Sequence, residues 1–299
     1  MNPLSALYGA GINVRNRLYD RGTFRARRLQ APVVSVGSIS AGGAGKTPFV
    51  ILLGELLMQR GVAFNVLSRG YERKTKGVLL VDPAGTPQEF GDEPLLIARR
   101  SGVPVFVAPQ RYDAGLLAES HPVQAAPAPP KVAQAELATP QVVVHILDDG
   151  FQHRQLHRDI DILLLNRADW HDRLLPSGNL REPLQAAMRA SVIAIPATEP
   201  ELETDLRARG WQGPVWRLHR RMEIPSLNGP VFAFCGIARS QQFFAGLAAA
   251  GLDLTGQRAF PDHHRYTAKD LDRLAGRATA VGATTILTTE KDEVRLMGL

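Results

Sequence analysis

A short glycine-rich segment that ends in lysine and threonine has the most recognisable chemistry in the chain. It reads Ser40-Ala41-Gly42-Gly43-Ala44-Gly45-Lys46-Thr47. Glycines let a backbone turn tightly and direct its N–H groups at phosphate oxygens. In loops of this pattern the lysine reaches the β- and γ-phosphates, and the hydroxyl group ligates Mg²⁺. The segment therefore predicts a nucleotide-binding loop in which Lys46 contacts phosphate and Thr47 contacts the metal.

The residues on both sides of this loop support the same interpretation. An apolar run at 32–36 precedes it and another at 49–58 follows it, which gives the strand, turn and helix that such a loop requires. Ser40 departs from the usual pattern, in which glycine occupies the first position. Because a Gly-Lys-Thr tripeptide alone often arises by chance, the prediction depends on this context.

Two adjacent acids follow a second apolar run. Asp148 and Asp149 come directly after the stretch 142–147, which is typical of a parallel strand buried on both faces. In phosphate-loop enzymes an acid at such a strand end holds Mg²⁺, directly or through water. An Asp-Gly pair is also common in turns, so a simple strand-end turn is the alternative. The glycine-rich loop favours metal binding.

Asp92 and a histidine pair are candidates for proton transfer. Asp92 opens a predicted helix, where an acid commonly caps the first turn. Phosphoryl transfer to an alcohol, however, needs a carboxylate or histidine that accepts the hydroxyl proton. His263 and His264 follow Asp262 in one loop, but no further metal ligand lies at a suitable spacing. A surface position is the alternative to a role beside Asp92.

Two arginines and a glutamate are weaker candidates. Arg69 follows the predicted strand 64–68, where it would face the nucleotide or the acceptor. Arg181 and Glu182 lie at the start of the predicted helix 182–190, where a guanidinium would steady a transferring phosphate. A solvent-exposed role explains each of them equally well.

Alternating apolar runs and helical patterns predict the α/β fold that positions these residues. Strands are expected at 33–37, 64–68, 103–107, 142–147, 161–165 and 191–195, and helices near 46–60, 93–101, 112–120 and 182–190. This alternation indicates a P-loop NTPase-like, mostly parallel sheet flanked by helices, with ligands at the carboxyl ends of its strands. The predicted core spans 31–212 and contains an Ala/Pro-rich insertion at 121–140.

A smaller C-terminal α/β domain is expected at 213–299. A Gly/Pro-rich stretch at 211–230 indicates a linker. The strands and helices expected after it lie at 231–235, 241–250, 268–279 and 284–288.

Composition and charge restrict the class of protein. The chain has 299 residues, of which 44% are hydrophobic, and its single cysteine, Cys235, excludes an internal disulfide framework. It contains no apolar run of about 18 residues, so no transmembrane span is expected. Most of the net charge of +6 comes from residues 1–30, which hold six arginines and one acid.

The same N-terminal segment has a helical pattern. Leu4, Leu7, Tyr8 and Ile12 recur at helical spacing. An apolar face beside arginines indicates either a helix on an anionic membrane surface or a helix packed on the body of the protein, and spacing does not distinguish them. No aromatic-basic interleaving or nucleic-acid module is present, so no nucleic-acid partner is expected.

Taken together, these motifs resemble the tetraacyldisaccharide 4′-kinase family, the lipid A 4′-kinases. The resemblance extends from about residue 8 to residue 296. Its segments are 36–48, 67–71, 91–94, 147–156, 174–183, 262–264 and 289–292. The string Asp-Asp-Gly-Phe-Gln-His at 148–153 is highly specific, and so is the order of the segments.

The resemblance implies that the γ-phosphate of ATP is transferred, with Mg²⁺, to the 4′-hydroxyl of a lipid A disaccharide 1-phosphate. It implies a monotopic enzyme at the cytoplasmic face of the inner membrane, and no obligate protein partner is expected. By position it also implies the roles of the site residues. Lys46 and Thr47 would serve the phosphates and the metal, and Asp148 and Asp149 would serve the metal. Asp92 with His263 would activate the sugar hydroxyl, and Arg181 and Glu182 would lie near the transferring phosphate.

The sequence departs from the family pattern in three places. Ala41 shows that the loop lacks the lysine of partition-type ATPases, and Glu72 stands where glycine is expected. The chain ends at Leu299, where the family usually continues through another strand. Either this member is short or its end is missing, and the C-terminal sheet is expected to lack an edge. A soluble P-loop kinase or ligase and a membrane-associated structural ATPase are alternative functions. A GTPase is disfavoured because no Asn-Lys-x-Asp sequence is present.

Overall fold

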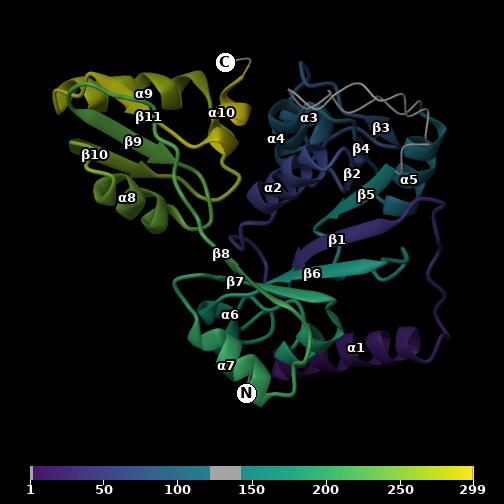
Figure 1. The fold of residues 1–299 in the computed structure, drawn as a ribbon. Coiled ribbons are helices and arrows are strands. Elements are labelled where there is room, and N and C mark those ends of the chain that lie inside the picture. The colour runs from purple at the N-terminus through teal and green to yellow at the C-terminus, as the bar shows by residue number, and fades with distance from the viewer. Residues whose placement is uncertain (1–2, 122–142, 298) are drawn as a thin grey trace.

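The computed structural model describes residues 3–121, 143–297 and 299, which form two β-sheets with helices around them (Figure 1). An eight-stranded sheet is built from residues 33–218 and a three-stranded sheet from residues 231–287. The predicted fold class is confirmed. Apart from His121, the insertion expected at 121–140 lies outside the described residues.

The large sheet is parallel except at one edge. Its strands are β1 (Val33–Ser38), β2 (Ala63–Ser68), β3 (Leu79–Leu80), β4 (Val105–Val107), β5 (Val143–Asp148), β6 (Ile160–Leu164), β7 (Val192–Pro196) and β8 (Val215–Leu218). They pair in the order β3-β4-β2-β5-β1-β6-β7-β8, and β3 runs antiparallel to β4. The carboxyl ends of the adjacent strands β2, β5 and β1 therefore meet at one edge, where α/β sheets bind their ligands.

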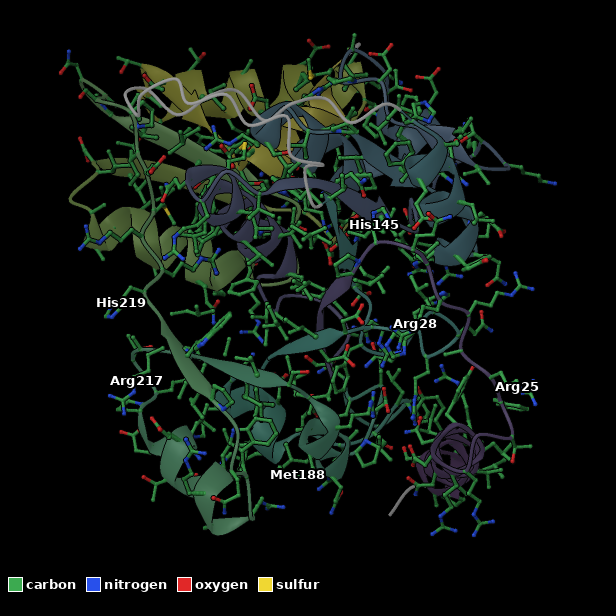
Figure 2. The ribbon with its side chains drawn as sticks, turned by 45° about the vertical axis from the view of Figure 1, so that its right-hand side comes forward. Arg25, Arg28, His145, Met188, Arg217 and His219 are labelled. Atoms are coloured by element: carbon green, nitrogen blue, oxygen red, sulfur yellow. The ribbon has the colours of Figure 1, made fainter. Side chains whose placement is uncertain are left out.

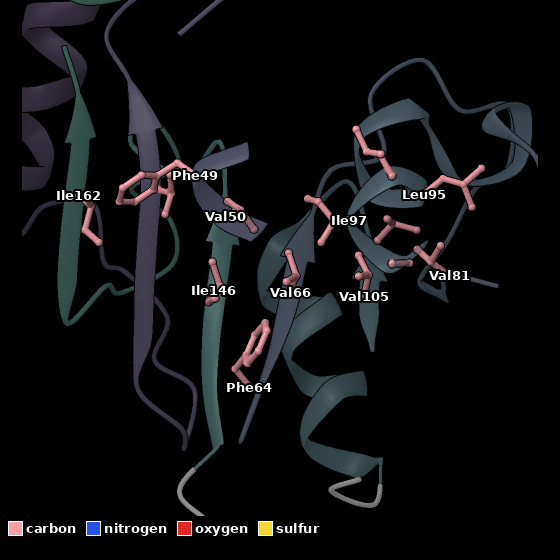
Figure 3. Packing of buried hydrophobic residues seen from close by; sticks show 14 of the residues in the cluster. Phe49, Val50, Phe64, Val66, Val81, Leu95, Ile97, Val105, Ile146 and Ile162 are labelled. Carbon is pink, nitrogen blue, oxygen red and sulfur yellow. The ribbon is translucent and has the colours of Figure 1, made fainter. Parts of the chain in front are cut away.

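Helices cover both faces of this sheet. They are α1 (Pro3–Asp20), α2 (Lys46–Gln59), α3 (Pro87–Phe90), α4 (Asp92–Ser101), α5 (Arg111–Ser120), α6 (Arg167–His171), the 3-10 helix η1 (Leu184–Arg189) and α7 (Glu201–Ala208). Phe49 of α2 and Ile97 of α4 pack with Ile146 on one face (Figure 3). Leu147, the next residue of β5, packs with Ala118 of α5 in a separate cluster. This alternation along a buried strand orients α2 and α4 on one face and α5 on the other.

Two details of the large unit differ from expectation. The helix predicted at 182–190 is the shorter 3-10 helix η1, which begins after Pro183. The stretch expected to begin a linker at 211 contains β8, which pairs in parallel with β7. The boundary expected at residue 213 is therefore too early, because the large sheet continues to residue 218.

The second unit is a parallel sheet with β9 (Val231–Cys235) between β10 (Leu254–Ala259) and β11 (Thr285–Leu287). Its helices are α8 (Ser240–Ala249), α9 (Ala268–Ala280) and α10 (Glu290–Leu296). The side chain of Thr267 accepts a hydrogen bond from the backbone of Asp270 and so caps α9. Helix α10, which the sequence analysis did not predict, packs against α4 of the large unit and joins the two units next to the site.

Helix α1 packs on the large unit with one face and exposes apolar side chains on the other. Tyr8 Oη donates a hydrogen bond to the backbone oxygen of Arg181 (3.0 Å), and Asn16 Nδ2 donates to Glu182 Oε2 (2.8 Å). On the outer face the side chain of Leu7 is 73% exposed. Among the described helices, none is both long enough and apolar enough to cross a membrane.

Candidate active site at the carboxyl edge of the large sheet

The glycine-rich loop connects β1 to α2 through three residues in the left-handed conformation. Gly42, Gly43 and Gly45 have φ angles of 73°, 64° and 78°, which other residues rarely adopt. Gly45 has no side chain to cap α2, so the first N–H groups of this 14-residue helix remain available to an anion. Ser40 has no positive φ, and Ser38 Oγ donates a hydrogen bond to its carbonyl oxygen (2.8 Å). Serine is therefore compatible with the first position of the loop.

Lys46 lies between this loop and the acidic pair. Its Nζ is 3.4 Å from Asp149 Oδ1, and Arg181 donates to both oxygens of the same carboxylate at 2.8 Å each. Desolvation opposes ionisation of Asp149, but the hydrogen bonds from Arg181 and the charge of Lys46 outweigh it and hold the pKa of Asp149 well below its usual range. Asp149 is therefore an anion that two cations compensate.

Asp148 has the opposite electrostatic environment. It ends β5, is buried, and accepts a hydrogen bond from Ser68 Oγ of β2 (2.9 Å). Burial, together with the negative charges of Asp149 and Glu93, raises the pKa of Asp148 to about 6. The pKa values of the two neighbouring acids are thus shifted in opposite directions, and the negative charge of Asp148 is incompletely compensated.

The donor atoms at this point suit a hard cation such as Mg²⁺. Thr47 offers a hydroxyl oxygen, and Asp148 and Asp149 offer carboxylate oxygens. Within the described ranges, no cluster of three or more His, Cys, Asp or Glu side chains forms a metal site without help. Mg²⁺ in kinases is typically held by one or two carboxylates together with substrate phosphates. The residues present therefore fit a cation that arrives with a nucleotide.

Asp92 and His263 are 171 residues apart in the chain and meet where the two units touch. His263 Nδ1 lies 3.1 Å from Asp92 Oδ2, and Arg295 of α10 donates from Nε to the same oxygen at 2.6 Å. Burial opposes ionisation of Asp92, but His263 and Arg295 lower its pKa below the ordinary value. The hydrogen bond to Asp92 raises the pKa of His263. At neutral pH this favours a carboxylate held by two hydrogen-bond donors.

The backbone of His263 is also unusual. Its φ is 57°, a left-handed conformation that costs a non-glycine residue about 1–3 kcal/mol and is concentrated at functional sites. The ring of Tyr71 meets the imidazole edge to face, with 5.6 Å between centroids. These contacts hold the imidazole in place over Asp92.

A second ion pair connects this point with the strand-end acids. Lys291 Nζ of α10 is 2.7 Å from Glu93 Oε1 of α4, and the charge of Glu93 acts on Asp148. Glu93 therefore links the two parts of the site electrostatically, because its charge acts on Asp148 and it pairs with Lys291 next to His263.

Positive charge is also concentrated near the strand-end acids. Arg111 is 7% exposed, and among the described residues its Nε has no hydrogen-bond partner. Burial lowers the pKa of Arg111 to about 10. Burial and the surrounding arginines lower the pKa of His153 to about 3. The charge of the exposed Arg69 acts on both residues, so this surface favours an anionic group.

The structure does not bring Glu182 to this surface. Its side chain is fully buried and accepts two hydrogen bonds from Arg189, at 2.6 and 2.7 Å, in addition to the one from Asn16. Its carboxylate is therefore engaged inside the protein, and the proximity of Glu182 to the transferring phosphate stays a prediction. Glu182 instead connects α1 to the core, whereas its neighbour Arg181 does face Asp149.

Sequence reasoning missed Arg111, His153 and Arg295. Arg111 and Arg295 are single charged residues without a distinctive spacing around them. His153 belongs to the segment 147–156, whose specific order of residues was a signal that could have identified it.

Comparisons with known proteins give a consistent result. A model of the family described as tetraacyldisaccharide-1-P 4′-kinase (LpxK) matches residues 1–299. The tetraacyldisaccharide 4′-kinase of Koribacter versatilis is 44% identical to the chain, with 99% of this chain and 88% of the relative covered. The protein of the same name from Aquifex aeolicus is 38% identical, with coverages of 99% and 89%.

A solved structure extends this similarity to three dimensions. The crystal structure of the "apo" form of LpxK from Aquifex aeolicus in complex with ATP superimposes with a TM-score of 0.73 and 36% identity, covering 99% of this chain and 89% of that one. Since the similarity in sequence and in fold extends over almost the whole chain, the protein belongs to the tetraacyldisaccharide 4′-kinase family.

Proposed function

We propose that this protein transfers the γ-phosphoryl group of ATP to the 4′-hydroxyl of a tetraacyldisaccharide 1-phosphate, a precursor of lipid A. The bond from the γ-phosphorus to the β–γ bridging oxygen breaks, a bond from the 4′-oxygen to phosphorus forms, and the hydroxyl proton passes to Asp92. The observation that carries the proposal is a network of charges in which Lys46 pairs with Asp149, the charge of Glu93 acts on Asp148, and His263, which pairs with Asp92, lies 3.9 Å from Glu93. It joins a phosphate-binding lysine to a proton acceptor in one site.

We further propose that residues 40–47 bind the phosphates of ATP. The N–H groups of the loop and of the first turn of α2 face the phosphate oxygens, and Lys46 exchanges Asp149 for phosphate. Arg181 keeps Asp149 paired when Lys46 leaves. Thr47, Asp148 and Asp149 would hold Mg²⁺, which when bound neutralises charge on the phosphate oxygens.

Asp92 is assigned as the acceptor of the hydroxyl proton. Its lowered pKa keeps it ionised at neutral pH, and His263 and Arg295 fix its orientation. A weakly basic carboxylate is sufficient, because phosphoryl transfer is catalysed mainly by positioning and electrostatics. Arg69, with Arg111 and His153 beside it, is assigned to a phosphate of the bound substrates.

We also propose that α1 lies on the anionic cytoplasmic face of the inner membrane. Leu7 and Val14 lie on its exposed face. Arg25 and Arg28 lie on the segment that leads from α1 to β1 (Figure 2). Apolar side chains enter the interface, and each basic residue near an anionic surface contributes about 1 kcal/mol. This location brings the site to an acceptor that is itself a lipid.

A single labelling experiment tests the proposed reaction. The protein is incubated with γ-labelled ATP, Mg²⁺ and a tetraacyldisaccharide 1-phosphate, and the lipids are separated by chromatography. We expect label on the lipid that survives mild acid, because the glycosidic 1-phosphate is the more acid-labile ester. Release of all label as inorganic phosphate would indicate an ATPase without an acceptor and would contradict the proposal.

A further inference from the structure

The loop that follows β9 brings the second unit against the glycine-rich loop. Residues 236–239 lead from β9 into α8. A Cβ atom added to Gly42 would lie 3.6 Å from the Cβ of Ala238, and one added to Gly43 would lie 2.7 Å from Nε of Arg239. The side chain of Arg239 therefore lies directly against the backbone of the loop that is proposed to bind the phosphates.

Among the described residues, Arg239 has no carboxylate partner, which it shares with Arg69 and Arg111. Arg181, Arg189 and Arg295 all form ion pairs. Within the described residues, the guanidinium of Arg239 has neither a hydrogen bond nor an ion pair, although it is partly buried. Its charge acts at a distance on the buried Asp169. A partly buried cation without a counter-ion, placed on a phosphate-binding loop, has the environment expected for a group that pairs with a bound polyphosphate.

The loop that carries Arg239 is also fixed to the proton acceptor. The carbonyl oxygen of Gly236 accepts a hydrogen bond from Nη1 of Arg295 (2.6 Å), and its N–H donates to Asp292 Oδ2 (3.0 Å). Arg295 in turn holds Asp92. Four consecutive residues thus connect the carboxylate that takes the hydroxyl proton with a guanidinium at the phosphate loop.

We propose that Arg239 is a catalytic residue that contacts the γ-phosphoryl group of bound ATP from the second unit, opposite Lys46. This inference rests on the proposed kinase function and adds a residue to it. A guanidinium presents several N–H donors to phosphate oxygens. Negative charge is spread over the γ-phosphoryl oxygens and the leaving oxygen during transfer, so a donor fixed there stabilises the transition state more than the ground state. The second unit then supplies both His263, which positions the proton acceptor Asp92, and Arg239, which contacts the γ-phosphoryl group.

The test compares Arg239→Ala and Arg239→Lys with the wild-type protein and with Arg277→Ala. Arg277 lies in the last turn of α9 in the same unit and is exposed, so it controls for the loss of a positive charge. We measure kcat and KM for ATP in the lipid labelling assay. Arg239→Ala is expected to lower kcat by about 10³-fold or more with KM within a few-fold of wild type. The kcat of Arg239→Lys is expected to lie between those of the wild-type protein and Arg239→Ala, because a single ammonium group replaces the several N–H donors of the guanidinium.

Two results would overturn the inference. One is a kcat of Arg239→Ala within about threefold of the Arg277→Ala value, and the other is a raised KM with unchanged kcat, which would show that Arg239 binds nucleotide without acting in the transfer. Thermal unfolding of each variant confirms folding, and we expect no loss because Arg239 forms no ion pair in the described structure. If the wild-type protein itself fails to label the lipid, the proposed function fails, and this result is distinct from either of the two.

Discussion

Replacing Arg295 by methionine is expected to destabilise the protein, because two carboxylates lose the guanidinium with which they form ion pairs. Its Nε lies 2.6 Å from Asp92 and its Nη1 3.0 Å from Asp292. The exposed fractions of the side chains are 4% for Arg295, 15% for Asp92 and 0% for Asp292. Removing one partner of a buried ion pair costs about 3–5 kcal/mol. At roughly 2 °C per kcal/mol for a chain of this size, the melting temperature should fall by about 6–10 °C.

The same helix pair provides a matched control. Arg100 of α4 and Glu290 of α10 also form an ion pair, at 3.2 Å, but their side chains are 49% and 55% exposed. An exposed pair contributes about 0–1 kcal/mol, so Arg100→Met should change the free energy of unfolding by no more than that. Unfolding of both variants by urea and by heat gives the comparison.

The destabilisation should also depend on pH, with a definite sign. Asp92 has a lowered pKa in the folded protein, so its ionised form contributes stability above the ordinary carboxyl pKa, and this contribution is lost as the pH falls through the lowered value. Without Arg295 the pKa of Asp92 rises, and the carboxylate left behind takes up a proton in acid. The difference from wild type should therefore be largest at neutral pH and should narrow near pH 4. A loss no greater than that of Arg100→Met at pH 7 would refute this reasoning.

Three further predictions concern activity and membrane binding. Lys46→Ala should lower lipid phosphorylation at least about 10²-fold, since it removes a fixed charge at the phosphates; turnover near the wild-type value would exclude the loop from catalysis. His263→Gln should shift the acid limb of the kcat/KM profile to higher pH, because His263 lowers the pKa of Asp92; an unmoved limb would show that the two groups are not coupled. Leu7→Glu combined with Val14→Glu should weaken binding to anionic vesicles in a flotation assay while leaving the melting temperature unchanged, because both side chains are exposed; unchanged flotation would place the membrane contact elsewhere.

Point substitutions are preferable to deletion of the N-terminal helix. Removing α1 would take away the donors that Tyr8 and Asn16 provide to Arg181 and Glu182. The carboxylate of Glu182 is fully buried, so loss of one of its partners would be costly. A deletion would therefore confuse loss of membrane binding with loss of stability.

The parts of the site that were predictable from sequence follow from local rules. Lys46 and Thr47 end a loop between an apolar strand and a helix, and Asp148 ends a continuous apolar strand. The carboxyl ends of parallel strands share one edge, so these residues had to lie close together. The fold class follows from the same alternation of strands and helices.

The rest depended on information that spacing does not contain. Nothing local relates Asp92 to His263, and only the family resemblance associated them. The adjacency of Arg181 and Glu182 in the sequence does not reveal that their side chains diverge. Arg239 and Arg295 make contacts between the two units, and neither lies in a recognisable pattern. For α1, the helical spacing was correct, but only the packed structure shows which residues face the body and which face outward.

The divergence of Arg181 and Glu182 has a mechanical consequence. One side chain holds Asp149 at the phosphate site, and the next is held by α1. Tyr8 of α1 also binds the backbone oxygen of Arg181. Two consecutive residues therefore bind the helix proposed to lie on the lipid surface and the carboxylate next to the phosphate loop. A tilt or slide of α1 strains these bonds, so the proposed contact of α1 with a membrane would be mechanically coupled to the geometry of the proposed catalytic centre.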